Sequence, residues 1–173
     1  MTKRWGLVVG ASLVLGAAAV FADSGTAVIQ STGEGGAVIG TATWTDSPAG
    51  LAVSIRVSGV SPGKHGLHVH EFGACSDQGK AAGSHYNPDG VPHGFAPNDG
   101  VMKAHPGDMG NLEADANGAG SLALILPDVS LSGGKYAVGG RAIVLHEKTD
   151  DFGQPTGNAG GRIGCGVIMI TGK

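Results

Sequence analysis

Charged and aromatic residues are scarce in this chain. Of its 173 residues, 14% are charged and 5% are aromatic, and the formal net charge is -3. No run of Lys or Arg forms the basic stripe that nucleic-acid binding requires, so we expect no nucleic-acid partner. Few segments have the apolar spacing of an amphipathic helix, which argues against a helical fold.

The motifs of several common enzyme classes are also missing. The chain has no internal repeat, no coiled-coil heptad and no glycine-rich phosphate loop that leads into a helix. It lacks the G-x-S-x-G of many hydrolases, and the serines near its histidines have no acid that could orient a catalytic triad. Nucleotide-dependent and serine-nucleophile enzymes are therefore disfavoured.

Glycine, by contrast, is abundant, with 33 residues, and hydrophobic residues make up 41% of the chain. The apolar residues alternate in short segments separated by glycine and proline turns, which is typical of strands and not of disorder. Such segments begin at Thr26, Ala37, Leu51, Lys64, Ser121, Tyr136 and Ile163. We predict one all-β domain over residues 23–173, with a long irregular loop from Gly73 to Gly110 and a second between the last two segments.

One long apolar run opens the chain. Lys3 and Arg4 precede it, and it ends with Val20 and Ala22 in the spacing of a cleavage site, so Met1–Ala22 is predicted to be a cleaved secretory signal peptide. An uncleaved membrane anchor is the alternative, because the run is just long enough to span a bilayer. Cleavage would change the formal charge from -3 to -5. We expect an exported protein, periplasmic or extracellular, with no stable membrane insertion.

The chain has two cysteines, Cys75 and Cys165. Disulfides persist in exported proteins, so these two are expected to be bonded. The bond would close a loop of about 90 residues, for which chain entropy gives roughly 4 to 5 kcal/mol. Metal ligation by both cysteines is the alternative, but the chain has many histidines for that purpose.

The segment K-H-G-L-H-V-H-E-F-G carries the first chemical signal. In a strand His68 and His70 share one face, and Leu67 and Val69 lie on the other. Two imidazoles at this spacing can bind one metal ion, although a hydrogen-bonded structural histidine explains the motif alone equally well. All seven histidines lie between His65 and His146, and this clustering favours metal binding.

The clustered residues are sufficient for two metal sites. Three imidazoles and one carboxylate form a closed tetrahedral set suited to zinc, and they come from His85, His93, His105 and Asp108. Further imidazoles suit a metal such as copper, which accepts a nitrogen site with open positions, and they come from His68, His70 and His146.

At this point the sequence resembles the copper,zinc superoxide dismutase family. The shared motifs stand in the family's order and are H-G-L-H-V-H-E-F-G, G-S-H-Y-N-P, H-P-G-D-M-G-N, V-L-H-E-K-T-D-D and G-N-A-G-G-R-I-G-C-G-V-I. The resemblance implies an eight-stranded Greek-key β-barrel, flattened like an immunoglobulin sandwich. It also implies an enzyme that converts superoxide to oxygen and hydrogen peroxide while a copper ion is alternately reduced and oxidised.

The resemblance assigns metal ligands by position. Copper would be bound by His68, His70, His85 and His146, and zinc by His85, His93, His105 and Asp108. His85 would thus bridge the two metals as an imidazolate. When copper is reduced, His85 would leave it, take up a proton and give that proton to the product.

The resemblance also assigns supporting roles. His65 matches a buried structural histidine, and Asp150 matches a carboxylate that hydrogen-bonds one copper ligand and one zinc ligand. Cys75 and Cys165 match the family's intrasubunit disulfide. Arg162 matches the residue that draws the anionic substrate toward copper; a surface arginine paired with Asp150 or a neighbouring carboxylate is its alternative.

Two loops depart from the family pattern. The segment 151–161 is short and has no Lys or Glu, and the segment 76–84 is longer than in the cytosolic eukaryotic relatives, which leaves a homodimer contact there open. The competing functions are a copper-binding module without turnover and a structural immunoglobulin-like domain. The first should lack a copper ligand or the arginine, and the second has no use for clustered histidines, so we expect the enzyme.

Overall fold

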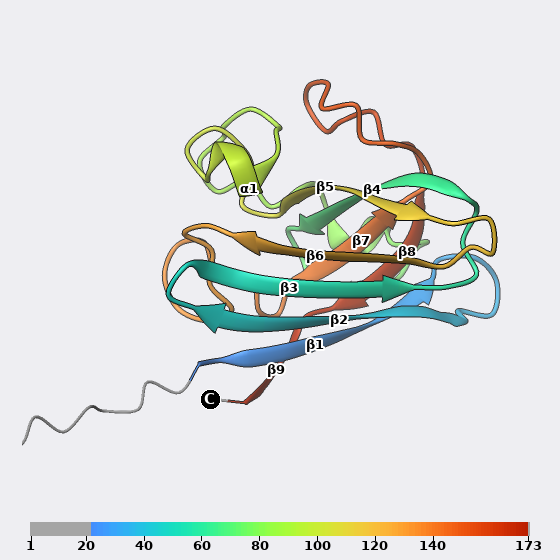
Figure 1. Ribbon diagram of the computed structural model, residues 1–173, viewed down its shortest axis with the longest axis horizontal. Coiled ribbons are helices and arrows are strands. Elements are labelled where there is room, and N and C mark those ends of the chain that lie inside the picture. Colours follow the sequence, from blue (N-terminus) through green and yellow to red (C-terminus); the bar gives the residue numbers. More distant parts are fainter. Residues whose placement is uncertain (1–21, 173) are drawn as a thin grey trace, which may run out of the picture.

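The computed structural model describes residues 22–172 (Figure 1). The predicted signal peptide lies outside these residues except for Ala22, and its cleavage stays a prediction. Among the residues that the structure describes, no helix is long and apolar enough to cross a membrane.

Within residues 22–172, nine strands make up almost all of the regular structure. They are β1 (Ser24–Ser31), β2 (Val38–Ser47), β3 (Gly50–Val57), β4 (Gly63–His70), β5 (Asp108–Ala114), β6 (Gly120–Leu126), β7 (Ala142–His146), β8 (Arg162–Val167) and β9 (Met169–Gly172). The described helices are a 3-10 turn, Lys80–Ala82, and a one-turn helix, α1 (Ala96–Asp99).

The strands form one closed antiparallel sheet. Their order is β2-β3-β6-β5-β4-β7-β8-β1-β9, and pairing of β1 with β2 closes the ring. Only Ile168 separates β8 from β9, and both pair with β1, so they act as one interrupted strand. The result is an eight-stranded barrel, which confirms the predicted fold class. Figure 1 shows β2, β3 and β6 in front, with β7 and β8 behind.

Alternation along the strands builds the barrel core. In β3, Leu51, Val53, Ile55 and Val57 point inward and are at most 5% exposed, while the residues between them face outward. β4 differs, because its last six residues are all buried. One face of β4 meets the barrel core and the other is covered by loops, so His68 and His70 are removed from water.

Two strand boundaries correct the sequence prediction. The loop expected to reach Gly110 ends at Asp108, where the unpredicted strand β5 begins. Its sequence barely alternates, and its pairing with β4, in which Leu112 lies opposite His65, fixes it as a strand. The strand expected from Tyr136 begins only at Ala142, because Gly140 has a φ of +79° in the turn just before it.

Two loops cover the outer face of β4, on one side of the barrel. One joins β4 to β5 and includes α1; the other joins β7 to β8 and is drawn in orange at the top of Figure 1. A disulfide between Cys75 and Cys165 ties the first loop to β8, as predicted. The disulfide thus anchors the β4–β5 loop on β8, which pairs with the histidine-bearing strand β7.

Candidate metal centre

Strands β4 and β7 supply the first three histidines of the centre. His68 lies between Asp108 of β5 and Val144 of β7 in the strand register, and His146 ends β7. A backbone bridge from His70 to His85 brings the loop histidine beside the strand. All of these imidazoles are buried, with at most 6% exposed.

The first donor cluster contains four imidazoles. Ligand atoms of its members lie within 4.8 Å of one another, and the members are His68, His70, His85 and His146. His70 donates its Nδ1 proton to the carbonyl of Gly83 (3.0 Å), which leaves the lone pair of Nε2 free. That Nε2 lies 3.3 Å from Nε2 of His146. The cluster therefore presents nitrogen lone pairs to a common point, as a copper site requires.

The second donor cluster surrounds Asp108. Its Oδ1 lies 3.2 Å from Nδ1 of both His85 and His105, and its Oδ2 lies 2.7 Å from Nδ1 of His93. A tight group within 4.8 Å contains His68 with His85, His93 and Asp108, and does not include His105. We place His105 in this cluster because its Nδ1 is also 3.4 Å from Nδ1 of His85, whereas His68 already belongs to the first cluster.

The donor atoms are placed to bind metal ions and not to hydrogen-bond one another. Among the described residues, Nδ1 of His68 and Nδ1 of His93 are buried without a hydrogen-bond partner. A buried polar atom left unpaired costs about 1 to 3 kcal/mol. The short approach of His93 to Asp108 lacks hydrogen-bond geometry, as expected when both lone pairs are directed at a third atom. Four imidazoles fit copper, and three imidazoles with one carboxylate fit zinc.

Asp150 connects the two clusters. One carboxylate oxygen accepts from Nε2 of His68 at 2.8 Å, and both oxygens lie 3.0 Å from Nε2 of His93. Each of these rings is thereby fixed with Nδ1 directed at its cluster. His65 acts elsewhere, because its Nδ1 lies 2.8 Å from the carbonyl oxygen of His146 and so links β4 to β7.

Arg162 lies directly opposite His146 in the pairing of β7 with β8. Its guanidinium donates to the carbonyls of Gly79 (2.5 Å) and Gly83 (2.6 Å), both in the first loop. In the part of the chain that the structure describes, it makes no ion pair with Asp150 or Asp151. Its positive charge stands near the first cluster and is held by neutral carbonyls, which leaves the charge available to an anion.

A comparison with known protein families identifies the family to which this chain belongs. The family model of copper/zinc superoxide dismutase matches residues 38–168, more than half of the chain. The chain therefore belongs to the copper/zinc superoxide dismutase family.

Named relatives are similar over most of the chain. It is 43% identical over 138 residues to the extracellular superoxide dismutase [Cu-Zn] of Caenorhabditis elegans, covering 76% of this chain and 61% of that protein. It is 43% identical over 142 residues to the protein of the same name from Drosophila melanogaster, covering 77% and 76%. The chain spans about three fifths to three quarters of the length of these relatives.

A solved structure supports the fold. A double mutant of a SOD-like protein from Bacillus subtilis superposes with a TM-score of 0.73 at 32% sequence identity. The match covers 83% of this chain and 96% of that chain.

Burial controls the protonation of the first cluster in this superoxide dismutase family member. It is the largest cause that lowers the pKa of His70 to about 2, of His146 to about 3 and of His85 to about 4. Neighbouring imidazoles lower all three values further. These rings are therefore neutral at physiological pH, which is the state that binds a metal.

The second cluster shows the opposite behaviour. Burial lowers the pKa of His93, but its close contacts with the carboxylates of Asp108 and Asp150 outweigh it and raise the pKa to about 9. Burial raises the pKa of both carboxyls, and hydrogen bonds from the imidazoles reverse this and hold each pKa well below its usual range. Two buried carboxylates attract positive charge here, which a proton on His93 provides in the metal-free chain and a cation would provide otherwise.

Sequence reasoning missed three residues of the centre. The side-chain amide of Asn111 donates to the carbonyl of Asp150 (2.9 Å) and accepts from its N–H (2.7 Å). Gln154 bonds the backbone of His93, and the ring of Phe152 stacks on the ring of His93 with centroids 6.3 Å apart. Asn111 stands in a motif used for the resemblance, but nothing in the sequence indicates what the other two contact.

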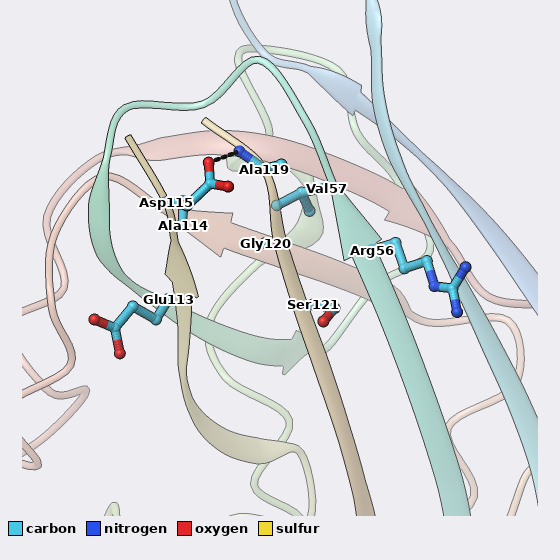
Figure 2. Close-up of a pocket in the computed structure, with 8 residues that line it drawn as sticks. All are labelled: Arg56, Val57, Glu113, Ala114, Asp115, Ala119, Gly120 and Ser121. Atoms are coloured by element: carbon cyan, nitrogen blue, oxygen red, sulfur yellow. Dashed lines mark hydrogen bonds between the residues drawn. The ribbon is translucent and has the colours of Figure 1, made fainter. Parts of the chain in front are cut away.

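One surface pocket lies away from the metal centre. It has a volume of about 670 Å³ and lies among β3, β5 and β6 (Figure 2). Arg56 and Glu113 point away from each other at its edges, and Asp115 accepts a hydrogen bond from the N–H of Ala119. It contains no histidine, so it takes no part in the site.

Proposed function

We propose that this chain is an enzyme, a superoxide dismutase that converts two superoxide anions and two protons into oxygen and hydrogen peroxide. The observation that carries the proposal is the arrangement of two donor clusters that share His85 and are connected by Asp150. A protein that only stores one metal has no need for a second cluster sharing a ligand with the first.

The two clusters differ in their donor atoms, and this difference determines which metal each would bind. Copper would be held by His68, His70, His85 and His146, and zinc by His85, His93, His105 and Asp108. When bound, copper supplies the exchange of one electron with each superoxide, and zinc has no redox chemistry of its own. His65 and Asp150 bind no metal and hold ligands in place.

His85 and Arg162 act on the substrate and its proton. His85 holds a proton on the ring nitrogen that faces the first cluster and releases it to the product. Arg162 draws the anion toward the first cluster, and the carbonyls of Gly79 and Gly83 keep its guanidinium oriented.

A copper-binding module without turnover is the alternative, and it is opposed by the intact set of donors together with Arg162. Dismutase activity distinguishes the two functions. Protein loaded with both metals should be active, protein loaded with zinc alone should be inactive, and His146→Ala should lose activity while it still binds zinc. An inactive protein that holds both metals would refute the enzyme.

Export belongs to the same proposal. The named relatives are extracellular, and the predicted signal peptide gives a route. Met1–Ala22 is removed, and the mature domain covers residues 23–173 in the periplasm or outside the cell. Sequencing of the amino terminus of secreted protein should begin at Asp23, and retention of Met1 would contradict cleavage.

The mature chain pairs as a homodimer in this proposal. Val28 of β1 and Met169 and Ile170 of the adjacent β9 are large apolar side chains that are 42% to 59% exposed. Apolar side chains gathered on adjacent strands mark candidate association surfaces. Sedimentation equilibrium should give twice the mass of the mature chain, and the mass of one chain would refute the dimer.

A further inference from the structure

The side-chain amide of Gln154 holds the backbone of His93 at both of its polar groups. Oε1 of Gln154 accepts from the N–H of His93 at 2.8 Å, and Nε2 of Gln154 donates to the carbonyl of His93 at 2.8 Å. The two bonds also fix the orientation of the amide, because an exchange of its oxygen and nitrogen would break both. We refer to this pair of bonds as the amide clamp.

The amide clamp joins the two loops that cover the outer face of β4. His93 lies in the β4–β5 loop and Gln154 in the β7–β8 loop, 61 residues later in the chain. Phe152, two residues before Gln154, stacks on the His93 ring with an interplanar angle of 21°. The β7–β8 loop thus contacts His93 through an aromatic face and two backbone hydrogen bonds.

The clamp completes the restraint of His93. Both ring nitrogens are already directed, Nδ1 toward Asp108 and Nε2 toward Asp150. A ring whose two nitrogens both face fixed partners stays in place only if the backbone of its residue also stays in place. Asp150 has the same kind of restraint, since the amide of Asn111 bonds its N–H and its carbonyl. Side-chain amides therefore fix the backbone on both sides of the hydrogen bond between His93 and Asp150.

The part of the β7–β8 loop over residues 151–161 is one of the two segments that depart from the family pattern, being short and free of Lys and Glu. We propose that Gln154 is a positioning residue for the zinc ligand His93, through which this short loop controls how long zinc is retained. The inference rests on the zinc assignment made in the proposed function. Gln154 touches neither metal nor substrate, and its effect reaches the site through the backbone of His93.

The test compares two substitutions of glutamine by methionine, which keeps the length of the side chain and removes its hydrogen bonds. Gln154→Met removes the clamp, and Gln30→Met is the matched control, because Gln30 is an exposed strand residue of β1. Both variants and the wild type are loaded with zinc and copper. The measurements are the rate of zinc transfer to a chromogenic chelator, the visible spectrum of Co²⁺ bound in the zinc site, and the melting temperature of the metal-free protein.

Gln154→Met should release zinc about 10-fold faster than the wild type, the lower end of the effect of residues that orient ligands. Its Co²⁺ bands should shift, while Gln30→Met matches the wild type in both measurements. The metal-free melting temperature should be equal in all three proteins, which separates positioning from a general loss of stability.

Equal zinc release and equal Co²⁺ spectra in Gln154→Met and the wild type would overturn the inference and leave the proposed function intact. Faster release accompanied by a matching fall in metal-free melting temperature would also overturn it, because the loop would then contribute only to folding. A wild type that binds no zinc would refute the proposed zinc assignment itself and the inference with it.

Discussion

The carboxylate of Asp150 serves both donor clusters although it is not among the ligands. It is 1% exposed and hydrogen-bonds Nε2 of His68 and of His93. An asparagine at this position keeps one oxygen as an acceptor, but its NH2 group cannot accept from the second imidazole. One of the two rings would therefore lose its orientation.

Asp150→Asn should lower copper affinity or dismutase activity by about 10- to 100-fold. Asp151→Asn is the control, since Asp151 is the adjacent carboxylate and bonds Gly153 and Asn158 but no histidine. Competition with a copper chelator gives the affinity. An Asp150→Asn protein with the affinity and rate of Asp151→Asn would show that the carboxylate does not orient the ligands.

Arg162→Ile tests substrate capture. With Met1–Ala22 removed as proposed, the formal charge would be -5 and would repel superoxide, so local positive charge would have to attract it. A unit charge about 6 Å from the anion contributes roughly 0.7 kcal/mol at the dielectric constant of water and about 3 kcal/mol at an effective value of 20. We expect the second-order rate constant to fall by about 10-fold, with both metals still bound.

The salt dependence identifies the cause of that fall. Added salt screens an attraction between exposed charges, so the rate constant of Arg162→Ile should decrease less with ionic strength than that of the wild type. Arg56→Ile makes the same charge change on β3, away from the metal centre, and serves as the control. Pulse radiolysis that gives equal rates and equal salt slopes for Arg162→Ile and wild type would exclude Arg162 as the guide.

Residue type, motif and family resemblance predicted the clustered donors and the carboxylate of Asp150, but not Gln154 and Phe152, which restrain His93. His85 and Asp108 stand in motifs whose metal-binding chemistry can be inferred from the side chains alone. Gln154 has an ordinary side chain, and its role depends on two loops meeting 61 residues apart in the chain. Such a meeting follows from the path of the folded backbone, which local sequence does not determine.

At the scale of elements, the disulfide connects the metal-bearing loop to β8. Cys75 lies just before the carbonyls of Gly79 and Gly83 that hold Arg162, and Cys165 lies within the strand that Arg162 begins. The bond therefore restrains the loop at the point where it meets the first donor cluster.

Reduction of this bond should loosen the loop before the barrel. We expect zinc to transfer to a chelator faster in the presence of a reductant, because the β4–β5 loop carries three of the proposed zinc ligands and loses its anchor. The same measurement on Cys75→Ser, which lacks the bond, gives the control and should not respond to reductant. Equal zinc release from the wild type with and without reductant would contradict a role for the bond in metal retention.

Strands were predicted well where one face is buried and the other is exposed to solvent. β3 alternates along its whole length, and its bounds follow the sequence prediction closely. β5 has Gly110 and two polar residues inside it, so its strand structure comes from pairing with β4 and not from its own pattern. Long-range pairing of this kind overrides local propensity.

At the scale of the whole molecule, the buried imidazoles make the metal-free protein sensitive to pH. The folded chain holds the pKa of His70, His85 and His146 at about 2, 4 and 3, against 6.5 for an ordinary histidine. Between pH 6.5 and 4 the unfolded chain therefore binds more protons than the folded chain. Each group lowers the free energy of unfolding by up to about 1.4 kcal/mol per pH unit as the pH falls through this range.

His93 acts in the opposite direction. Its folded pKa of about 9 lies above 6.5, so its contribution to stability is complete below pH 6.5 and is lost as the pH rises to 9. The metal-free protein should thus be most stable near pH 6.5 and lose stability more steeply on the acid side, where three groups act. Urea unfolding at pH 5, 6.5 and 8.5 measures this, and a stability that increases from pH 6.5 to pH 5 would contradict it.

The central claim is that two donor clusters sharing His85 hold two different metals in one chain. Elemental analysis of the purified mature protein, after loading with copper and zinc and removal of free ions, tests it most directly. The result we predict is one copper and one zinc per chain. Zinc alone after copper loading would contradict the claim. It would favour the alternative function, a metal-binding module without enzymatic turnover.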